Sequence, residues 1–233
     1  MMVSDSTPRS DEELIPAATV VLGRNSPEGF EVLMLRRNST IAFGGAWVFP
    51  GGRVDADDDG HDELTRARSA AIREAAEETG LDIVGQPLGV WSYWVPPPMK
   101  AMVIEGKKRR FGTWFFVGHA PDCEVQIDMG EIHEHRWLRP HRALELHRAG
   151  EIELIPPTWI TLYELDKHET IDAAIDATSR IEPPRFVTFP IPGDPIILAW
   201  EGDVAYRDRS RVDEPGPRNR LIMAEGSWAY ERR

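Results

Sequence analysis

The stretch Ala70–Leu81, AAIREAAEETGL, places the strongest constraint on what this chain can fold into. Its glutamates Glu74, Glu77 and Glu78 are spaced i, i+3 and i+4, so on a helix their carboxylates share one face. Like charges at this spacing repel each other, so we expect a cation beside them. Such a cluster suits a hard divalent cation like Mg²⁺, which takes oxygen ligands. The alternative interpretation is a solvated surface helix that binds nothing.

The residues around this stretch predict a helix from about Asp62 to Thr79. Gly80 follows at the position where helices commonly end in a left-handed residue. Arg73 stands one turn before Glu77, so the two side chains can pair along the helix. The apolar side of this helix is formed by residues at helical spacing, namely Leu64, Ala67, Ala71, Ile72 and Ala75.

A second feature lies upstream, where Phe49-Pro50-Gly51-Gly52 predicts a strand end that runs into a tight turn. FPGG followed by REAAEETGL resembles the signature of the Nudix hydrolases, here called the box, which ends R-E-apolar-x-E-E-x-G-apolar. The resemblance implies an α/β (α+β) Nudix fold, with a mixed β-sheet sandwiched between helices and the box as a loop-helix-loop. The fixed positions of the ending are all met, by Arg73, Glu74, Ala75, Glu77, Glu78, Gly80 and Leu81.

The resemblance also implies an activity, the divalent-metal-dependent hydrolysis of a diphosphate linkage in a nucleoside diphosphate derivative. Glu74, Glu77 and Glu78 would hold Mg²⁺ or Mn²⁺, with the carbonyl of Gly52 as a further ligand. Arg73 would orient the carboxylates rather than touch the substrate.

One carboxylate must also take up a proton in this reaction. It is either a box glutamate or one of Glu131 and Glu134, which lie in a segment, EIHEHRWL, that resembles the acidic strand late in many Nudix domains. The sequence does not choose between them.

The box departs from the family in its length. Fourteen positions separate the glycine from the arginine in the family, whereas here the separation is 73 − 52 = 21. Counting six from Gly52, where the family has a glutamate, gives Asp58, and counting back eight from Arg73 gives Thr65. We interpret the aspartates of this insertion as a solvated spacer that ends in a helix N-cap, with a second metal site as the alternative. They are Asp55, Asp57, Asp58 and Asp59.

The elongated box after WVFPGGRVD resembles the subgroup of peroxisomal coenzyme A diphosphatases related to human nudix-type motif 19. This resemblance favours coenzyme A or acyl-coenzyme A as substrate, with ADP-ribose, NADH or a nucleotide sugar as the alternative. A hypothesis of another class is a non-catalytic Nudix domain that senses a nucleotide. That hypothesis would be expected to come with lost box carboxylates, and all three are present.

Two groups of arginines are candidates for binding the substrate phosphates. Arg36 and Arg37 form either a charged strand end or a bidentate phosphate contact. Arg109 and Arg110 belong to GKKRR, which predicts a basic hairpin tip that is either solvated or a partly exposed contact to the 3′-phosphate of coenzyme A.

The pattern of strands and helices predicts one Nudix domain at residues 14–182. A disordered acidic tail is expected at residues 1–13, and a β-rich extension, packed on the same domain, at 183–233. Trp91 and Trp94, in a predicted strand, are interpreted as core residues, with base stacking as the alternative. Strands are expected at 15–22 and 30–36, which form a hairpin, at 47–49, 88–95, 111–117 and 131–138, and in the extension at 186–189, 196–200 and 220–224. Helices are expected at 140–149 and 158–177.

Composition limits the partners. A net charge of −12 argues against a broad nucleic-acid surface, which needs a positive footprint. The single cysteine, Cys123, excludes an intrachain disulfide, and no apolar run approaches the ~18–20 residues of a membrane helix. The N-terminus, MMVSDSTPRSDEEL, lacks the apolar core of a signal peptide. We therefore expect a cytoplasmic protein that binds a small nucleotide derivative, and the sequence leaves a homodimer open.

Overall fold

The computed structural model describes residues 14–38, 45–98, 102–104 and 107–233. These residues form two compact units. The box unit contains Pro16–Ser92 and Thr113–Pro183, and the strand-rich unit contains Tyr93–Gly112 and Pro184–Arg233. The tail expected at residues 1–13 and Gly106 of the basic tip lie outside the described residues. Within those residues, no helix combines the length and the apolar character that crossing a membrane requires.

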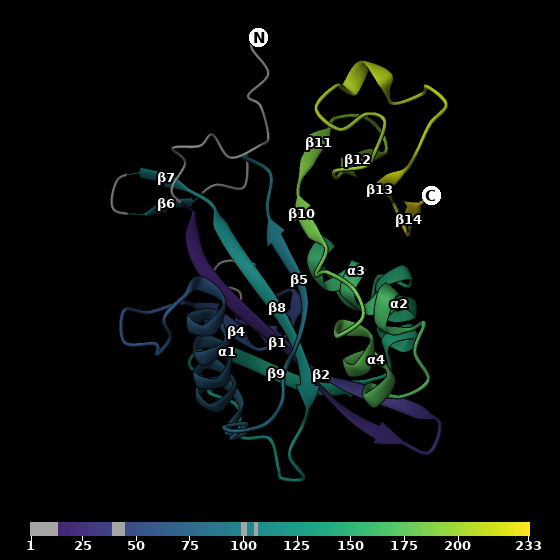
Figure 1. The fold of residues 1–233 in the computed structure, drawn as a ribbon. Helices are drawn as coiled ribbons and strands as arrows, with labels where there is room; N and C mark the ends of the chain where they lie inside the picture. Colours follow the sequence, from purple (N-terminus) through teal and green to yellow (C-terminus); the bar gives the residue numbers. More distant parts are fainter. Residues whose placement is uncertain (1–13, 39–44, 99–101, 105–106) are drawn as a thin grey trace. The chain divides into compact units, whose positions relative to one another are not determined.

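The box unit is built on a twisted sheet with the strand order β5-β8-β1-β2-β3, to which β4 adds on β1 and β9 on β2 (Figure 1). The pair of β1 with β2 is antiparallel, as the predicted hairpin requires, and β9 also pairs antiparallel with β2. The strands are β1 (Ile15–Ser26), β2 (Gly29–Arg37), β3 (Trp47–Val48), β4 (Gly51–Arg53), β5 (Gly89–Val95), β8 (Phe111–His119) and β9 (Ile132–Leu138).

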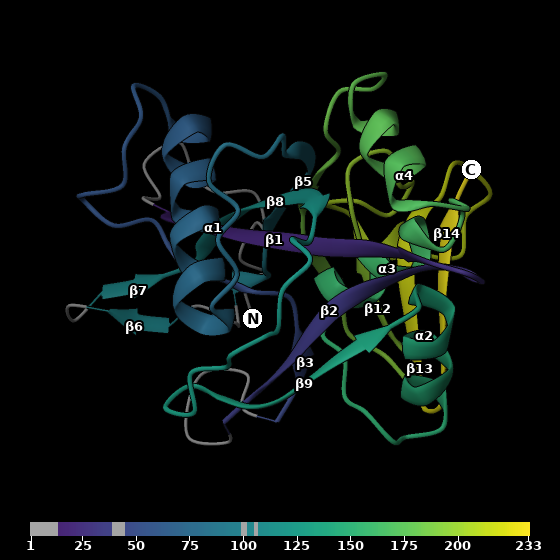
Figure 2. The same ribbon diagram turned by 90° about the horizontal axis from the view of Figure 1, so that it is seen from below.

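Helices cover both faces of this sheet. Figures 1 and 2 show α1 (Glu63–Thr79) on one side, and on the other α2 (Pro140–Arg148), α3 (Pro156–Leu165) and α4 (Ile171–Thr178). The alternate side chains Ala18, Val20 and Leu22 of β1 face α1, because successive residues of a strand point to opposite faces. Small side chains bring the helix close to the sheet, and they are the buried alanines Ala67, Ala70, Ala71 and Ala75.

Helix α1 begins and ends where the sequence predicts. The carboxylate of Asp62 accepts a hydrogen bond from Thr65 N (2.8 Å), and the hydroxyl of Thr65 accepts one from Asp62 N (3.2 Å), so the two form a capping box. At the other end, Gly80 adopts φ 69°, a left-handed conformation that glycine adopts at no steric cost. The caps therefore fix where α1 begins and ends.

The single helix expected at residues 158–177 was wrong, because the chain forms two helices there. Helix α3 begins with Pro156 and Pro157, which fit a first helical turn, and ends at Leu165. Helix α4 has its own N-cap, Thr170, whose side chain accepts a hydrogen bond from Ala173 N. An internal cap of this kind starts a new helix rather than continuing the old one.

The strand-rich unit contains the β-rich C-terminal segment expected from the sequence. It has a four-stranded antiparallel sheet, a parallel pairing of β10 with Tyr93–Val95 of β5 that makes the large sheet mixed, and a two-stranded hairpin. Sequence analysis missed its last strand, β14. The elements are β6 (Met102–Ile104), β7 (Lys107–Arg109), β10 (Arg185–Val187), β11 (Phe189–Ile191), β12 (Ile196–Ala199), the short 3₁₀ helix η2 (Arg209–Arg211), β13 (Asn219–Ala224) and β14 (Ser227–Arg232).

Aromatic rings form the core of the strand-rich unit. Trp94 stacks on Phe186 with ring centroids 4.0 Å apart, and Trp200 meets both rings edge-on at 5.7 and 5.3 Å. Trp94 and Trp200 are buried, and the indole N–H of Trp200 donates to the hydroxyl of Thr188 (3.0 Å). Trp94 is therefore a core residue, in agreement with the favoured interpretation.

A buried ion pair also holds this unit together. The guanidinium of Arg220 donates to both oxygens of Asp203 (2.6 and 2.7 Å), and the amides of Ala205 and Asn219 donate to the same carboxylate. Burial acts to raise the pKa of Asp203, but these hydrogen bonds outweigh it, and the pKa is lowered. A carboxylate with a depressed pKa stabilises the fold above its ordinary pKa, and this contribution is lost as the pH falls through the depressed value.

We predict that Asp203→Asn destabilises the strand-rich unit by about 3 kcal/mol at pH 7, because Arg220 is left buried without a counter-charge. The difference from wild type should shrink below about pH 4, as the wild-type carboxylate takes up its proton. Thermal unfolding followed by near-ultraviolet circular dichroism of the tryptophans would measure both effects. Equal unfolding midpoints at pH 7 would contradict the prediction.

Candidate active site

The carboxylates of α1 face a glycine turn at the start of β4. Gly51 and Gly52 pair with Thr19 and Ala18 of β1, which brings this backbone against the helix. A Cβ atom on Gly52 would lie 2.3 Å from Oε1 of Glu74, and one on Gly51 would lie 2.4 Å from the carbonyl oxygen of Ala18. At Gly51 the obstacle is backbone, so only glycine fits there, whereas a side chain at Gly52 would displace the carboxylate of Glu74. The GG pair thus lets the backbone approach the carboxylates closely.

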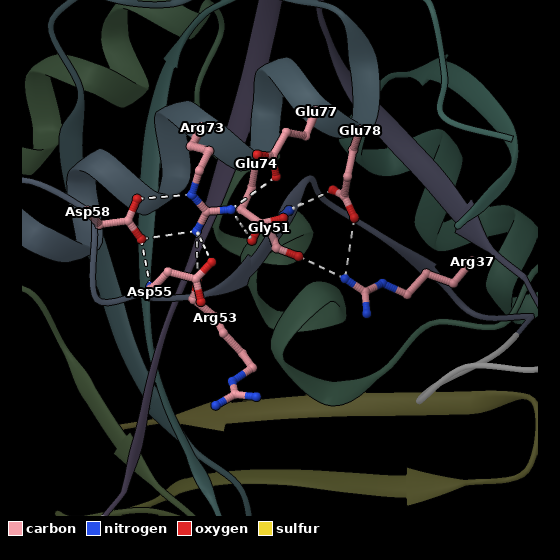
Figure 3. Close-up of polar contacts among 9 residues, drawn as sticks. All are labelled: Arg37, Gly51, Arg53, Asp55, Asp58, Arg73, Glu74, Glu77 and Glu78. Carbon is pink, nitrogen blue, oxygen red and sulfur yellow. Dashed lines mark hydrogen bonds and ion pairs between the residues drawn. The ribbon is translucent and has the colours of Figure 1, made fainter. Parts of the chain in front are cut away.

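Arg73 is the centre of the polar network in Figure 3. Its guanidinium donates Nε and Nη2 to the two oxygens of Asp58 (3.0 Å each) and Nη1 to Glu74 (2.9 Å) and Glu77 (3.0 Å). Nη2 also donates to the carbonyl oxygen of Arg53 (2.9 Å). Its hydrogen bonds to Asp58 lead the interactions that raise the pKa of Arg73, so this side chain stays charged. The arginine thus ties the helix to the inserted loop and to β4.

Asp58 is a partner that sequence analysis did not recognise, since it was assigned to a solvated spacer. Its side chain is only 5% exposed, and it accepts a hydrogen bond from Asp55 N (2.7 Å) besides those from Arg73. Burial acts to raise the pKa of Asp58, but the bonds from Arg73 and Asp55 N outweigh it and lower the pKa. Its position, six residues after Gly52, was the signal in the sequence. The spacer interpretation is therefore wrong for Asp58, whereas Asp57 and Asp59 are exposed.

Glu78 is the most buried of the three glutamates, with a side chain 5% exposed. Its Oε2 accepts from Gly51 N (2.9 Å), and its Oε1 lies 3.5 Å from Nη2 of Arg37. Burial raises the pKa of Glu78 to about 7, and the charges of Glu74 and Glu131 act in the same direction against Arg37 and Gly51 N. Arg37 and the Gly51 amide therefore do not offset the effect of burial on the pKa of Glu78.

Glu74 and Glu77 extend the acidic surface along α1. Burial raises the pKa of Glu74, which is held mainly by Arg73, and the charges of Glu77 and Glu131 add to this effect. The side chain of Glu77 is 59% exposed and reaches the same nitrogen of Arg73. The three glutamates thus share one face, as their spacing predicts.

The two candidate bases outside the box lie in different surroundings. Glu131 is exposed at the turn before β9, and its charge reaches both Glu74 and Glu78. Glu134 lies on β9 itself, where its Oε1 accepts from Nε of Arg136 (2.7 Å) and its Oε2 lies 3.9 Å from Nη1 of Arg36. The structure therefore associates Glu131 with the box electrostatically and surrounds Glu134 with arginines.

The candidate phosphate-binding arginines belong to different units, Arg36 and Arg37 to the box unit and the other two to the strand-rich unit. Nη2 of Arg37 donates to the carbonyl oxygen of Gly51 (2.7 Å) and faces Glu78, so this side chain points into the box (Figure 3). Arg109 and Arg110 belong to the strand-rich unit. Arg110 is only 1% exposed and donates to the carbonyl oxygen of Pro96 (2.9 Å), which differs from the partly exposed contact we expected of it.

The sequence model of the NUDIX domain matches residues 14–157, which is more than half of the chain. The chain belongs to the Nudix family. Two relatives named RNA pyrophosphohydrolase are similar to it. The protein of Dinoroseobacter shibae is 29% identical, over 43% of this chain and 64% of its own length. The protein of Sphingopyxis alaskensis is 31% identical, over 51% of this chain and 71% of its own length. The chain thus spans slightly less than two thirds of the first of these relatives.

The fold of the Nudix domain is also found among solved structures. The crystal structure of a NUDIX hydrolase from Alicyclobacillus acidocaldarius superposes with a TM-score of 0.61 at 22% sequence identity. The matched region covers 72% of this chain and 97% of the Alicyclobacillus acidocaldarius chain. At this identity the similarity establishes the fold.

Nudix hydrolases generally use divalent metal ions, and the donors in this box fit such an ion chemically. They are hard carboxylate oxygens, one of them on the buried Glu78, and they lie beside a glycine backbone with no side chain between. Among the residues that the structure describes, no three acidic, histidine or cysteine side chains already converge on one point. In Figure 3 these carboxylates contact Arg73 and Arg37, which hold them on the side of α1 that faces the glycine turn.

We predict that Asp58→Asn lowers stability by about 2 kcal/mol, since a bond between charged groups becomes one to a neutral amide. Because Arg73 would then hold the glutamates less firmly, kcat/KM should fall by about 10- to 100-fold. Asp57→Asn, at the exposed position directly before Asp58 in the same loop, is the matched control and should change neither quantity. Thermal melting and initial rates that are the same for both variants would show that Asp58 is a spacer after all.

Proposed function

We propose that this protein is a divalent-metal-dependent hydrolase that cleaves the diphosphate linkage of a nucleoside diphosphate derivative. The observation that carries the proposal is the carboxylate face of α1, with Glu78 buried, beside the Gly51–Gly52 turn. Three carboxylates that repel each other are costly to keep on one helix face without a cationic partner. Arg73 offsets part of this charge, and a divalent cation is the simplest remaining partner.

Each residue of the site then has a distinct task. When bound, Mg²⁺ or Mn²⁺ supplies charge neutralisation at the phosphates and lowers the pKa of a bound water. Glu74, Glu77 and Glu78 provide the ligands, with the carbonyl of Gly52 as a further one. Arg73 keeps these carboxylates in register through its bonds to Asp58 and the Arg53 carbonyl.

The proton of the attacking water goes to Glu131 in this proposal. Glu131 is exposed, so it can exchange its proton with solvent, and its charge reaches Glu74 and Glu78. Glu134 is the weaker candidate, because its carboxylate is already bonded to Arg136 and lies 3.9 Å from Arg36.

Coenzyme A or acyl-coenzyme A is the substrate that we favour, and ADP-ribose, NADH or a nucleotide sugar is the alternative. Support for coenzyme A comes from the resemblance of the long box to the coenzyme A diphosphatases. The burial of Arg110 removes one of the contacts that we had considered for the 3′-phosphate. The names of the two relatives favour a second candidate, a diphosphate linkage of an RNA, against which the net charge of −12 argues.

We predict that Glu77→Gln lowers turnover at saturating Mg²⁺ by orders of magnitude and weakens Mn²⁺ binding, measured by electron paramagnetic resonance. The fold should be kept, because an exposed pair such as Glu77–Arg73 contributes little to stability. Glu63→Gln, in the first turn of the same helix, is the control and should behave like wild type.

The substrates for this comparison are coenzyme A, ADP-ribose, NADH and a 5′-triphosphorylated oligoribonucleotide, with products identified by mass spectrometry. Hydrolysis of any of them in ¹⁸O-water should place the label on a product phosphate. Turnover by Glu77→Gln equal to wild type would overturn the metal assignment. Binding of a nucleotide with no hydrolysis by wild type would instead support the nucleotide-sensing alternative.

A further inference from the structure

Asn38, the residue after β2, holds the turn that carries Glu131. Its side-chain amide donates to the carbonyl oxygens of Gly130 (2.8 Å) and Met129 (3.3 Å), and its backbone N–H donates to the carbonyl oxygen of Glu131 (2.9 Å). Three successive carbonyl groups of the turn are thus bound by one residue. The sequence analysis assigned no task to Asn38.

The other side of this turn is bound to the box helix. Asp128 N donates to the carbonyl oxygen of Glu78 (3.1 Å), and the carbonyl oxygen of Asp128 accepts from the amides of Glu131 (3.1 Å) and Ile132 (2.8 Å). The carboxylate of Asp128 accepts from Gly130 N (2.8 Å). Glu131 is therefore connected to Glu78 through two hydrogen-bonded backbone steps, and Asn38 closes the turn from the opposite side.

We propose that Asn38 is a positioning residue for the hydrolytic reaction, which fixes the Glu131 turn beside the carboxylates of the box. The inference rests on the proposed function, since it gives Glu131 the task of accepting the proton. Arg37 binds the Gly51 carbonyl and faces Glu78. The end of β2 thus contacts the glycine turn, the box helix and the base-carrying turn through two consecutive residues.

The geometry explains why such a residue is needed. Ile127 and Ile132 anchor the two ends of this turn in the core, but Met129 and Glu131 between them are exposed, so burial does little to hold the turn itself. Its position depends instead on hydrogen bonds, of which the Asn38 side chain supplies two. A general base contributes about 10²- to 10⁴-fold to a rate, and a misplacement of about 1 Å costs about 10²-fold. Loosening the turn should therefore affect the chemical step rather than the binding of metal or substrate.

A double-mutant cycle with Asn38→Ala and Glu131→Gln tests the proposal on the full chain. With Mg²⁺ and the substrate found in the panel, Asn38→Ala should lower kcat by about 10- to 100-fold in the wild-type background, with KM changed by less than about 3-fold. In the Glu131→Gln background the same substitution should have almost no further effect. Mn²⁺ affinity, measured without substrate, should stay within about 2-fold of wild type, because no metal donor has been removed.

Asn25→Ala is the control, since the side-chain amide of Asn25 also makes two hydrogen bonds in the same unit. It donates to the carboxylate of Asp172 and accepts from Ile171 N. Asn25→Ala should leave kcat unchanged. Asn38→Ser, which keeps one shorter donor, should give an intermediate kcat and serves as the second variant if the alanine variant folds poorly.

Three results would overturn the proposal. They are an equal loss of kcat from Asn38→Ala in both backgrounds, a loss confined to KM or Mn²⁺ affinity, and a Glu131→Gln variant with wild-type kcat. The last result would remove Glu131 from the reaction while leaving the box chemistry intact, because Glu77→Gln tests that chemistry separately. Wild-type turnover by Glu77→Gln would, in contrast, contradict the proposed function itself.

Discussion

The guanidinium of Arg73 is the interaction on which the rest of the site depends. It joins a helix, an inserted loop and a strand through bonds to Asp58, Glu74, Glu77 and the Arg53 carbonyl. Three glutamates on one helix face would otherwise repel each other and favour a different arrangement of their side chains. An arginine suits this task because its planar fork offers five donors and keeps its charge.

The two arginines at the box neutralise only part of the negative charge of its carboxylates. Arg73 forms ion pairs of 2.9 to 3.0 Å with Asp58, Glu74 and Glu77. The ion pair of Arg37 with Glu78 is longer, with 3.5 Å between Nη2 and Oε1. Burial still raises the pKa of Glu78 to about 7. The remaining charge deficit is the physical reason to expect a cation here. It also explains how a chain with a net charge of −12 could bind phosphates at this point, because a bound cation inverts the local field.

The sequence predicted the features that depend on local patterns. The capped helix α1, the hairpin of β1 and β2 and the shared face of the three glutamates follow from spacing and caps, and the structure has all of them. The pairing of Asp58 with Arg73 could not be predicted in this way, since the two residues are 15 positions apart and Asp58 lies in the inserted loop. The burial of Arg110 and the tethering of Glu131 by Asn38 likewise depend on tertiary contacts.

The most direct test of the central claim is to locate a cation by anomalous diffraction from crystals grown with Mn²⁺. The account predicts that the strongest anomalous peak lies within about 2.5 Å of oxygens from at least two of Glu74, Glu77 and Glu78. The bond between Asp58 and Arg73 should be kept in that structure. A strongest peak among the aspartates of residues 55–59, or no peak at the box at a saturating Mn²⁺ concentration, would contradict the account.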